Sequence, residues 1–293
     1  MRNLYQEAKN CFLMSDPDEK LQLSLETASA WDAGQLNWQE GETPLQPVIQ
    51  LNQPGRLEKP ELVAAAKVKN RGFKSIQQRA ALIHALAHIE MTAVNLAWDS
   101  IYRYRHMPEE YYNDWVTTAR EETQHFYLLR QSLRDMGYDY GDLPAHNELW
   151  QMAVNTADDL MARMAIVHRV LEARALDVVP FSVDKFRSIG DKQTADSLII
   201  IANDEIGHVN AGTRWFRYRC EQEQLDADKM FFTLMKKYLH STPKGPFNRE
   251  ARLKAGFSQY EMRELERLDR EYKEALRKSQ SQSQSQSQSQ SKR

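Results

Sequence analysis

Two stretches of this sequence decide how the rest is interpreted: Glu121-Glu122-Thr123-Gln124-His125 and Asp204-Glu205-Ile206-Gly207-His208. Each contains Glu-x-x-His in the middle of a long helical pattern. A residue and its third successor share one face of a helix, so each pair directs a carboxylate and an imidazole the same way. A further glutamate, Glu90, precedes the first pair by 32 residues, and Glu172 precedes the second by 33. This repeated Glu…Glu-x-x-His set is found in two-metal carboxylate sites of four-helix bundles.

Apolar residues at helical spacing predict four long helices around these residues. Ser75 with Gln78 resembles a capping box at the start of the first helix, and Gly137 and Pro180 are expected to end the second and third. The helices are expected at about 75–104, 108–136, 148–179 and 191–224, with an irregularity in the third near Asn155-Thr156. The intervening residues 138–147 are long enough, when extended, to cross from one end of a bundle to the other.

The predicted fold is therefore all-α, a four-helix bundle with a long crossover between its second and third helices and additional helices at both ends. Residues 1–74 form an N-terminal helical extension and connection, and 75–224 form the bundle. Residues 225–278 are expected to be helices that pack on the bundle. The Ser-Gln repeat at 279–293 has no apolar residues to bury and is predicted to be disordered.

Composition narrows the cellular context. The 293 residues carry a formal net charge of −2, which gives no general reason to expect nucleic acid or a membrane as partner. No apolar run approaches the roughly 20 residues that span a bilayer, and the N-terminus lacks a signal-peptide pattern. With 2 cysteines, the chain has no disulfide framework. These features favour a cytoplasmic protein.

The position of the ionisable residues strengthens the metal hypothesis. A Glu-x-x-His pair alone is a weak signal, but these residues interrupt the apolar stripes of four helices, where an unpaired carboxylate would cost several kcal/mol. Divalent ions would offset that cost, and this ligand set suits iron or manganese. The predicted ligands are Glu90, Glu122, His125, Glu172, Glu205 and His208.

Two alternatives remain open from the sequence alone. The glutamates could lie at helix surfaces or pair with arginines such as Arg120, Arg163 and Arg174. In addition, His125 could pair with the residue four positions earlier, Glu121. His208 could pair in the same way with Asp204, because either spacing shares a helix face.

Three further residues are expected to support the ligands. Glu121 and Asp204 stand just before ligand glutamates, and each could hold a histidine of the opposing helix pair. His168 lies one turn from Glu172 on the same face, which makes it a candidate for supporting the site or lining a substrate pocket. His88, two residues from Glu90, is expected to point away from the site and to be structural.

Several stretches of the sequence resemble one known bacterial family. Together they cover about half of the chain, and Ala175 stands where the family pattern has glycine. The resemblance is to a ferritin-like family described as a domain of unknown function, within the di-iron carboxylate superfamily. The matching stretches include His88-Ile89-Glu90, Glu121 to Phe126, Tyr140 to His146, Leu171 to Asp177 and Asp204 to Val209.

This resemblance implies a di-metal site made by the six predicted ligands, with two iron ions or, alternatively, manganese. The leading functional hypothesis is an oxidoreductase that uses dioxygen to act on a small-molecule substrate. One alternative is an iron-binding or storage protein without an organic substrate. Another is a non-catalytic or RNA-associated scaffold that uses basic residues such as Lys67, Lys69, Arg71 and Lys74. The amphipathic C-terminal helix favours a homodimer.

Overall fold

The computed structural model describes residues 2–39, 47–50, 52–68, 71–239, 241 and 243–290, with side chains up to 278. The described chain is helical apart from two paired two-residue parallel strands, β1 (Arg2–Asn3) and β2 (Leu36–Asn37), and an isolated bridge. The loop around residue 45 and Lys69 of the basic stretch lie outside the described residues. The helices before the crossover are α1 (Leu4–Leu13), α2 (Pro17–Asp32), the short 3₁₀ helix η1 (Ala65–Lys67), α3 (Ile76–Arg103) and α4 (Glu109–Asp135).

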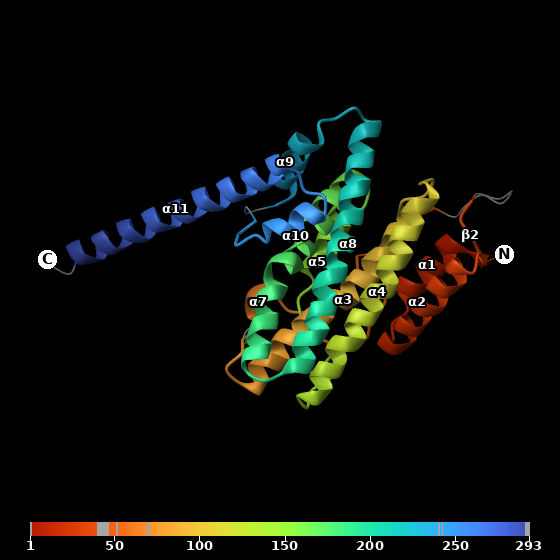
Figure 1. Ribbon diagram of the computed structural model, residues 1–293, viewed down its shortest axis with the longest axis horizontal. Coiled ribbons are helices and arrows are strands. Elements are labelled where there is room, and N and C mark those ends of the chain that lie inside the picture. Colours follow the sequence, from red (N-terminus) through yellow and green to blue (C-terminus); the bar gives the residue numbers. More distant parts are fainter. Residues whose placement is uncertain are drawn as a thin grey trace.

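Four long helical segments lie side by side in the centre of the molecule (Figure 1). They are α3, α4, the segment η2 (Met164–Glu172) with α7 (Arg174–Ser188), and α8 (Lys192–Gln222). The predicted start of the first is confirmed, because the Ser75 hydroxyl accepts a hydrogen bond from the Gln78 N–H at 3.2 Å. α3 packs on α4, α7 packs on α8, and α4 also contacts α8. Buried side chains of the four segments therefore pack together in one core.

The third segment is interrupted after Asn155, where the sequence predicts an irregularity, but the interruption is larger than expected. Its first part is a separate short helix, α5 (Glu148–Asn155), followed by a turn and the four-residue α6 (Leu160–Arg163). The chain then continues as the π-helix η2, a wider helical form that often occurs at functional sites. The predicted end at Pro180 is wrong, since α7 continues to Ser188. Pro180 is exposed, and burial of Val183 and Phe186 beyond it offsets the lost backbone hydrogen bond.

Both ends of the chain pack on this core. In the N-terminal part, Asp16 caps α2 by accepting hydrogen bonds from the backbone N–H groups of Asp18 and Glu19. α1 packs on α3, and α2 packs on α4. Buried hydrogen bonds join these layers, for example from the Trp98 indole to the Ser24 hydroxyl at 2.8 Å. The N-terminal helices thus cover one side of the four segments (Figure 1).

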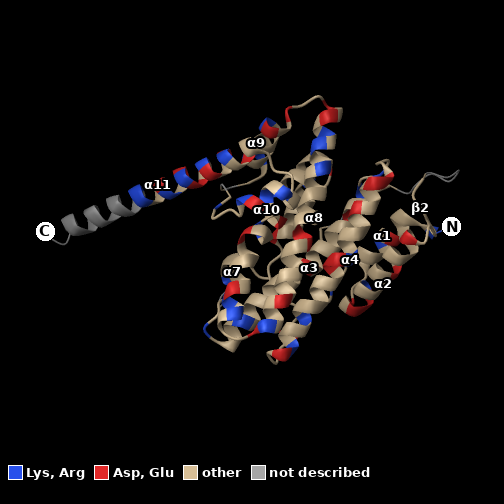
Figure 2. Ribbon diagram, in the orientation of Figure 1, with Lys and Arg blue, Asp and Glu red and all other residues tan. Residues whose placement is uncertain are grey.

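The C-terminal helices α9 (Ala227–Tyr238), α10 (Arg249–Lys254) and α11 (Gln259–Gln290) lie against η2 and α8 or extend from them. Acidic and basic residues alternate along the described side chains of α11 (Figure 2). The described backbone of α11 continues to Gln290. The disorder expected for the Ser-Gln repeat at 279–293 stays a prediction.

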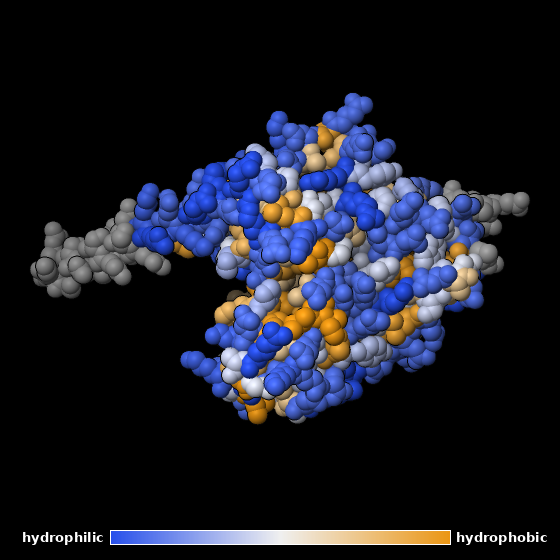
Figure 3. All heavy atoms as spheres, in the orientation of Figure 1, coloured by the Kyte–Doolittle hydropathy of each residue, from blue (hydrophilic) through white to orange (hydrophobic). Residues whose placement is uncertain are grey.

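The hydrophobic residues are mostly inside. α3 is the one described helix that is long and apolar enough to cross a membrane by length and composition, and 72% of its most apolar window is buried within the protein. On the face shown in Figure 3, hydrophilic residues cover most of the surface. Hydrophobic residues gather on this face over the region where α7 and α8 lie in Figure 1.

Candidate metal centre

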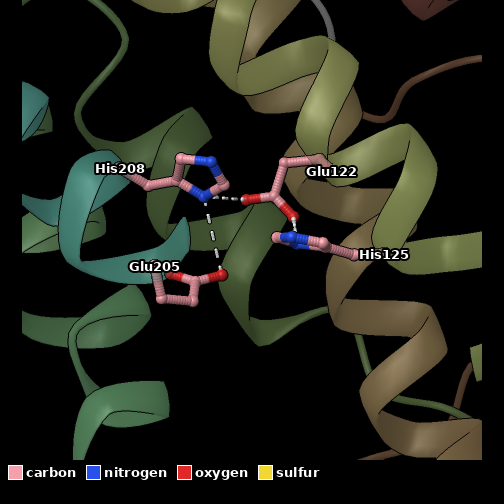
Figure 4. Close-up of side chains that lie close together, drawn as sticks. All are labelled: Glu122, His125, Glu205 and His208. Carbon is pink, nitrogen blue, oxygen red and sulfur yellow. Dashed lines mark hydrogen bonds and ion pairs between the residues drawn. The ribbon is translucent and has the colours of Figure 1, made fainter. Parts of the chain in front are cut away.

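Two carboxylates and two imidazoles meet in the centre of the four segments. Glu122 and His125 come from α4, and Glu205 and His208 come from α8. One ligand atom from each residue lies within 4.8 Å of the others, and all four side chains are buried. Figure 4 shows the side chains of the two helices pointing toward one another. Both Glu-x-x-His stretches therefore contribute to one cluster.

The orientation of the two histidines follows from their outer neighbours. His125 Nε2 lies 3.1 Å from an oxygen of Asp204 on the opposite helix, and His208 Nε2 lies 2.8 Å from an oxygen of Glu121. A carboxylate accepts hydrogen bonds, so each Nε2 carries a proton and donates it outward. Each Nδ1 therefore faces the cluster. The structure thus pairs His125 Nε2 with Asp204 and His208 Nε2 with Glu121, in each case across the two helices. The alternative pairings of His125 with Glu121 and of His208 with Asp204 are not formed.

Glu122 lies between the two imidazoles. Its Oε2 is 3.3 Å from His125 Nδ1, and its Oε1 is 3.0 Å from His208 Nδ1. Glu205 lies on the other side of His208, with its Oε1 3.7 Å from the same Nδ1. With one oxygen directed at each histidine, Glu122 has the geometry of a carboxylate that could bridge two ions.

The remaining two predicted ligands lie at the edge of the cluster. Glu90 Oε2 is 3.4 Å from His125 Nδ1. Glu172, at the end of η2, is instead hydrogen-bonded to His168, with 2.5 Å between the Glu172 carboxylate and His168 Nδ1. His168 stacks obliquely on Trp115, with 4.3 Å between ring centroids. His168 is therefore in direct contact with a predicted ligand, Glu172.

Burial and mutual repulsion shape the protonation of the cluster. Burial, with the neighbouring charge of Glu122, raises the pKa of Glu90 to about 8. Burial alone would lower the pKa of His125, but the neighbouring carboxylates of Glu122 and Glu90 raise it to about 11. The carboxylates around His208 likewise raise its pKa well above its usual value. In the metal-free protein, the imidazoles of His125 and His208 therefore stay protonated and supply the positive charge that a bound cation would supply.

Some polar atoms of the cluster are left without a hydrogen-bond partner. Glu205 Oε2 is buried and has none, and the contacts of Glu90 Oε2 with His125 and of His208 Nδ1 with Glu122 lack hydrogen-bond geometry. Buried polar atoms are normally satisfied, and each exception has a cost in free energy. A cation in the cluster would satisfy these three atoms together. The donor set of carboxylate oxygens and imidazole nitrogens fits iron or manganese. This buried cluster could therefore hold a metal ion.

The alternative that the glutamates pair with nearby arginines does not hold for the three arginines considered. Arg120 pairs with Asp32 at 2.7 Å, Arg163 with Asp99 at 2.8 Å, and Arg174 with Asp177 at 3.3 Å. All six predicted ligands are instead buried among the central segments. Their charges are thus met within the cluster itself.

Sequence reasoning missed two residues that shape the site. Trp115 lies two turns before Glu122 on α4 and was not among the predicted site residues. Gly212 on α8 packs so closely on η2 that an added Cβ would lie 2.6 Å from the Cβ of His168. The glycine in a helix interior was the available signal, because glycine there is otherwise unfavourable. His84 and His88 face the crossover, where His88 Nδ1 lies 2.8 Å from the Tyr140 hydroxyl.

Comparisons with known proteins agree on a family. The family model described as "Protein of unknown function (DUF455)" matches residues 13–263. An uncharacterised protein of Haemophilus influenzae is 44% identical over 212 residues, which cover 70% of this chain and 74% of that protein. No solved structure matches the chain significantly. The chain therefore belongs to the DUF455 family of proteins of unknown function.

Proposed function

We propose that this protein is a di-metal carboxylate oxidoreductase of the ferritin-like kind, which binds two iron ions, or manganese, and uses dioxygen. One observation carries the proposal: two histidines direct Nδ1 at a shared carboxylate while carboxylates of the opposite helix hold their Nε2 protons. Outer carboxylates of this kind fix the tautomer and orientation of metal-binding histidines. The proposed ligands are Glu90, Glu122, His125, Glu172, Glu205 and His208.

The proposed ligands take different roles. Glu122 and Glu205 are the proposed bridging carboxylates. Glu122 lies between the two histidines, and Glu205 Oε1 is 3.7 Å from His208 Nδ1 on its other side. Glu90 and Glu172 would each bind one ion, as would His125 and His208. Glu172 would share its carboxylate between an ion and His168, its present hydrogen-bond partner. In this arrangement each half of the site uses one Glu…Glu-x-x-His set.

Two ferrous ions, when bound, would supply electrons for the reduction of dioxygen. The surrounding residues would keep this chemistry away from bulk water, since the ligands are buried. Insertion of one oxygen atom into a substrate C–H bond releases the other atom as water. That balance requires two electrons from an external reductant and two protons. Glu121 and Asp204, which are partly exposed, keep the imidazoles oriented throughout.

Oxygen consumption tests this proposal. The full chain is loaded with ferrous iron without oxygen, and uptake is followed after mixing with oxygenated buffer. We expect a rapid phase that Glu205→Ala abolishes, because that change removes a proposed bridging ligand. Glu221→Ala, an exposed position on the same helix, should behave as the unmodified chain. Uptake no faster than that of the same iron in buffer would contradict the proposal.

A further inference from the structure

A cavity of about 200 Å³ lies beside the candidate metal centre. Four of the proposed ligands form part of its wall, namely Glu90, Glu122, Glu172 and Glu205. Most of the remaining wall is apolar and comes from α3, η2, α7, α8 and the start of α5. Examples are Leu86, Ile89 and Ala93 on α3, Val179 on α7, and Leu198 and Ile201 on α8. The carboxylates of the cluster therefore face an apolar cavity as well as one another.

The size of this cavity limits what can fill it. An apolar cavity of about 150 Å³ in another protein stays dry and binds benzene. A cavity of about 200 Å³ has room for a slightly larger group, such as a substituted aromatic ring or a short alkyl chain. Larger ligands would have to extend beyond the rim. The volume therefore selects a small apolar group as the part that lies next to the carboxylates.

The cavity has a buried end and a more open side. Ala93 and Ile201 at the buried end have exposed fractions of 4% and 1%. Leu86, Leu171 and Val178, in contrast, are only partly buried. These open-side residues come from α3, η2 and α7, whereas the buried end lies between α3 and α8. A ligand could therefore enter between α3 and α7 and place its innermost atoms near the cluster.

Charge further restricts the ligand. Four carboxylates line the cavity, and a ligand carboxylate buried beside them would meet like charge and lose its hydration. The polar rim residues are His146, Glu148 and Arg174. His146 Nδ1 is buried and has no hydrogen-bond partner, so it offers one polar contact at the rim. The arrangement suits a ligand with a neutral apolar inner part and any polar group at its outer end.

We infer that this cavity is the substrate site, and that it binds a neutral aromatic ring or short alkyl group with its C–H bonds toward Glu122 and Glu205. The assignment of this ligand as a substrate rests on the proposed function. The binding itself does not, because the apolar walls exist without a metal ion. The substrate class is therefore a small neutral molecule, or a larger one that inserts such a group.

Binding of fluorinated probes tests this inference by fluorine NMR on the full chain. Fluorobenzene represents the neutral apolar class, and 4-fluorobenzoate is its anionic counterpart. We expect fluorobenzene to bind both metal-free and iron-loaded protein, and 4-fluorobenzoate to bind metal-free protein at least about tenfold more weakly because its charge must be buried. Tighter binding of the benzoate would overturn the neutral class.

Cavity-filling variants locate the probe. Ala93→Phe places a ring inside the cavity and should reduce fluorobenzene affinity at least about tenfold, since the space is no longer free. Ala175→Phe, at a partly exposed wall position, is a second variant that is easier for the fold to accommodate. Ile200→Phe, on an exposed position of α8 next to Ile201, is the matched control and should bind as before. Circular dichroism verifies that each variant is folded.

The outcomes separate this inference from the proposed function. Protein that binds two metal ions but shows no fluorobenzene binding would overturn the cavity assignment and leave the metal proposal intact. Protein that binds fluorobenzene but no metal would overturn the proposed function alone. Equal affinity in the unmodified chain and in folded Ala93→Phe and Ala175→Phe would place the probe elsewhere and contradict the inference.

Discussion

The side chains of His125 on α4 and His208 on α8 are oriented by equivalent hydrogen bonds across the contact between the two helices. Each donates from Nε2 to a carboxylate of the facing helix, and each presents Nδ1 to Glu122. The outer partners, Asp204 and Glu121, directly precede the glutamates of the two Glu-x-x-His pairs. One short sequence pattern thus supplies a ligand glutamate, a ligand histidine and the group that orients the histidine across the interface.

Removing an outer carboxylate should weaken metal binding without unfolding the protein. We expect Asp204→Asn and Glu121→Gln each to lower metal affinity about 10–100-fold, because an uncharged amide is a weaker acceptor for the histidine N–H and no longer fixes its tautomer as a carboxylate does. Both side chains are about one-third exposed, so thermal stability should change little. Competition with a chelator measures the affinity. Unchanged affinity in both variants would rule out this role.

Metal binding should release protons, with an affinity that rises with pH. The pKa of His125 is raised to about 11 and that of Glu90 to about 8, so both groups hold protons at neutral pH in the metal-free protein. A metal ion must displace these protons, and it therefore competes better as pH rises from about 6 to about 8. Calorimetry in buffers of different ionisation enthalpy counts the released protons. Binding without proton release would contradict this assignment.

At the scale of residues, spacing and helical periodicity were sufficient to predict that the two Glu-x-x-His pairs meet. They could not decide between a histidine pairing on its own helix and one pairing across the interface, since both spacings share a face. They also could not give the torsion angles that turn Glu172 toward His168. Such choices depend on how closely two helices approach, and the sequence pattern of a single helix carries no information about that distance.

At the scale of elements, the contact between α8 and η2 is set by one glycine. Gly212 has no space for a Cβ beside His168, whereas Gly207, one turn earlier on α8, has nothing within 4 Å. Both are helix-interior glycines, yet only the first is needed for packing. The sequence predicted the third and fourth helices but missed the π-helix and the continuation through Pro180. The π-helix and the continuation through Pro180 both depend on packing against α8, which outweighs the conformational preferences of the local sequence.

These two glycines give a matched pair of substitutions. Gly212→Ala should destabilise the fold by about 1–3 kcal/mol, because His168 or the η2 backbone must move to accept the methyl group. Gly207→Ala should stabilise it by up to about 1 kcal/mol through helix propensity. Denaturant unfolding measures both. Equal effects of the two changes would show that the close approach of α8 and η2 is not a constraint.

At the scale of the whole molecule, the C-terminal helices are joined to the core by a buried ion pair. The Arg169 guanidinium on η2 donates to both oxygens of Glu261 on α11 at 2.8 Å. It also lies 4.3 Å from the ring centroid of Phe231 on α9. Glu261 closes a capping box with Ser258 at the start of α11. The sequence predicted helices packed on the core, but not this distant pairing, which joins residues 92 positions apart.

Breaking this pair should cost far more than breaking a surface pair. Glu261→Ala leaves the Arg169 charge buried without its partner, and we expect a loss of about 3–5 kcal/mol in unfolding free energy. Glu250→Ala removes an exposed pair with Lys254 on α10 and should change the unfolding free energy far less, because solvent screens an exposed pair. Thermal unfolding compares the two variants. A similar loss in both would show that Arg169 does not depend on Glu261.

The most direct test of the central claim is the metal content of the full chain after loading with ferrous iron without oxygen and removal of free metal. We predict two iron ions per chain, and a large loss of bound iron in Glu122→Ala, because Glu122 lies between both histidines. Glu250→Ala is the control and should retain the iron of the unmodified chain. Equal iron content in the unmodified chain and in Glu122→Ala would contradict the account.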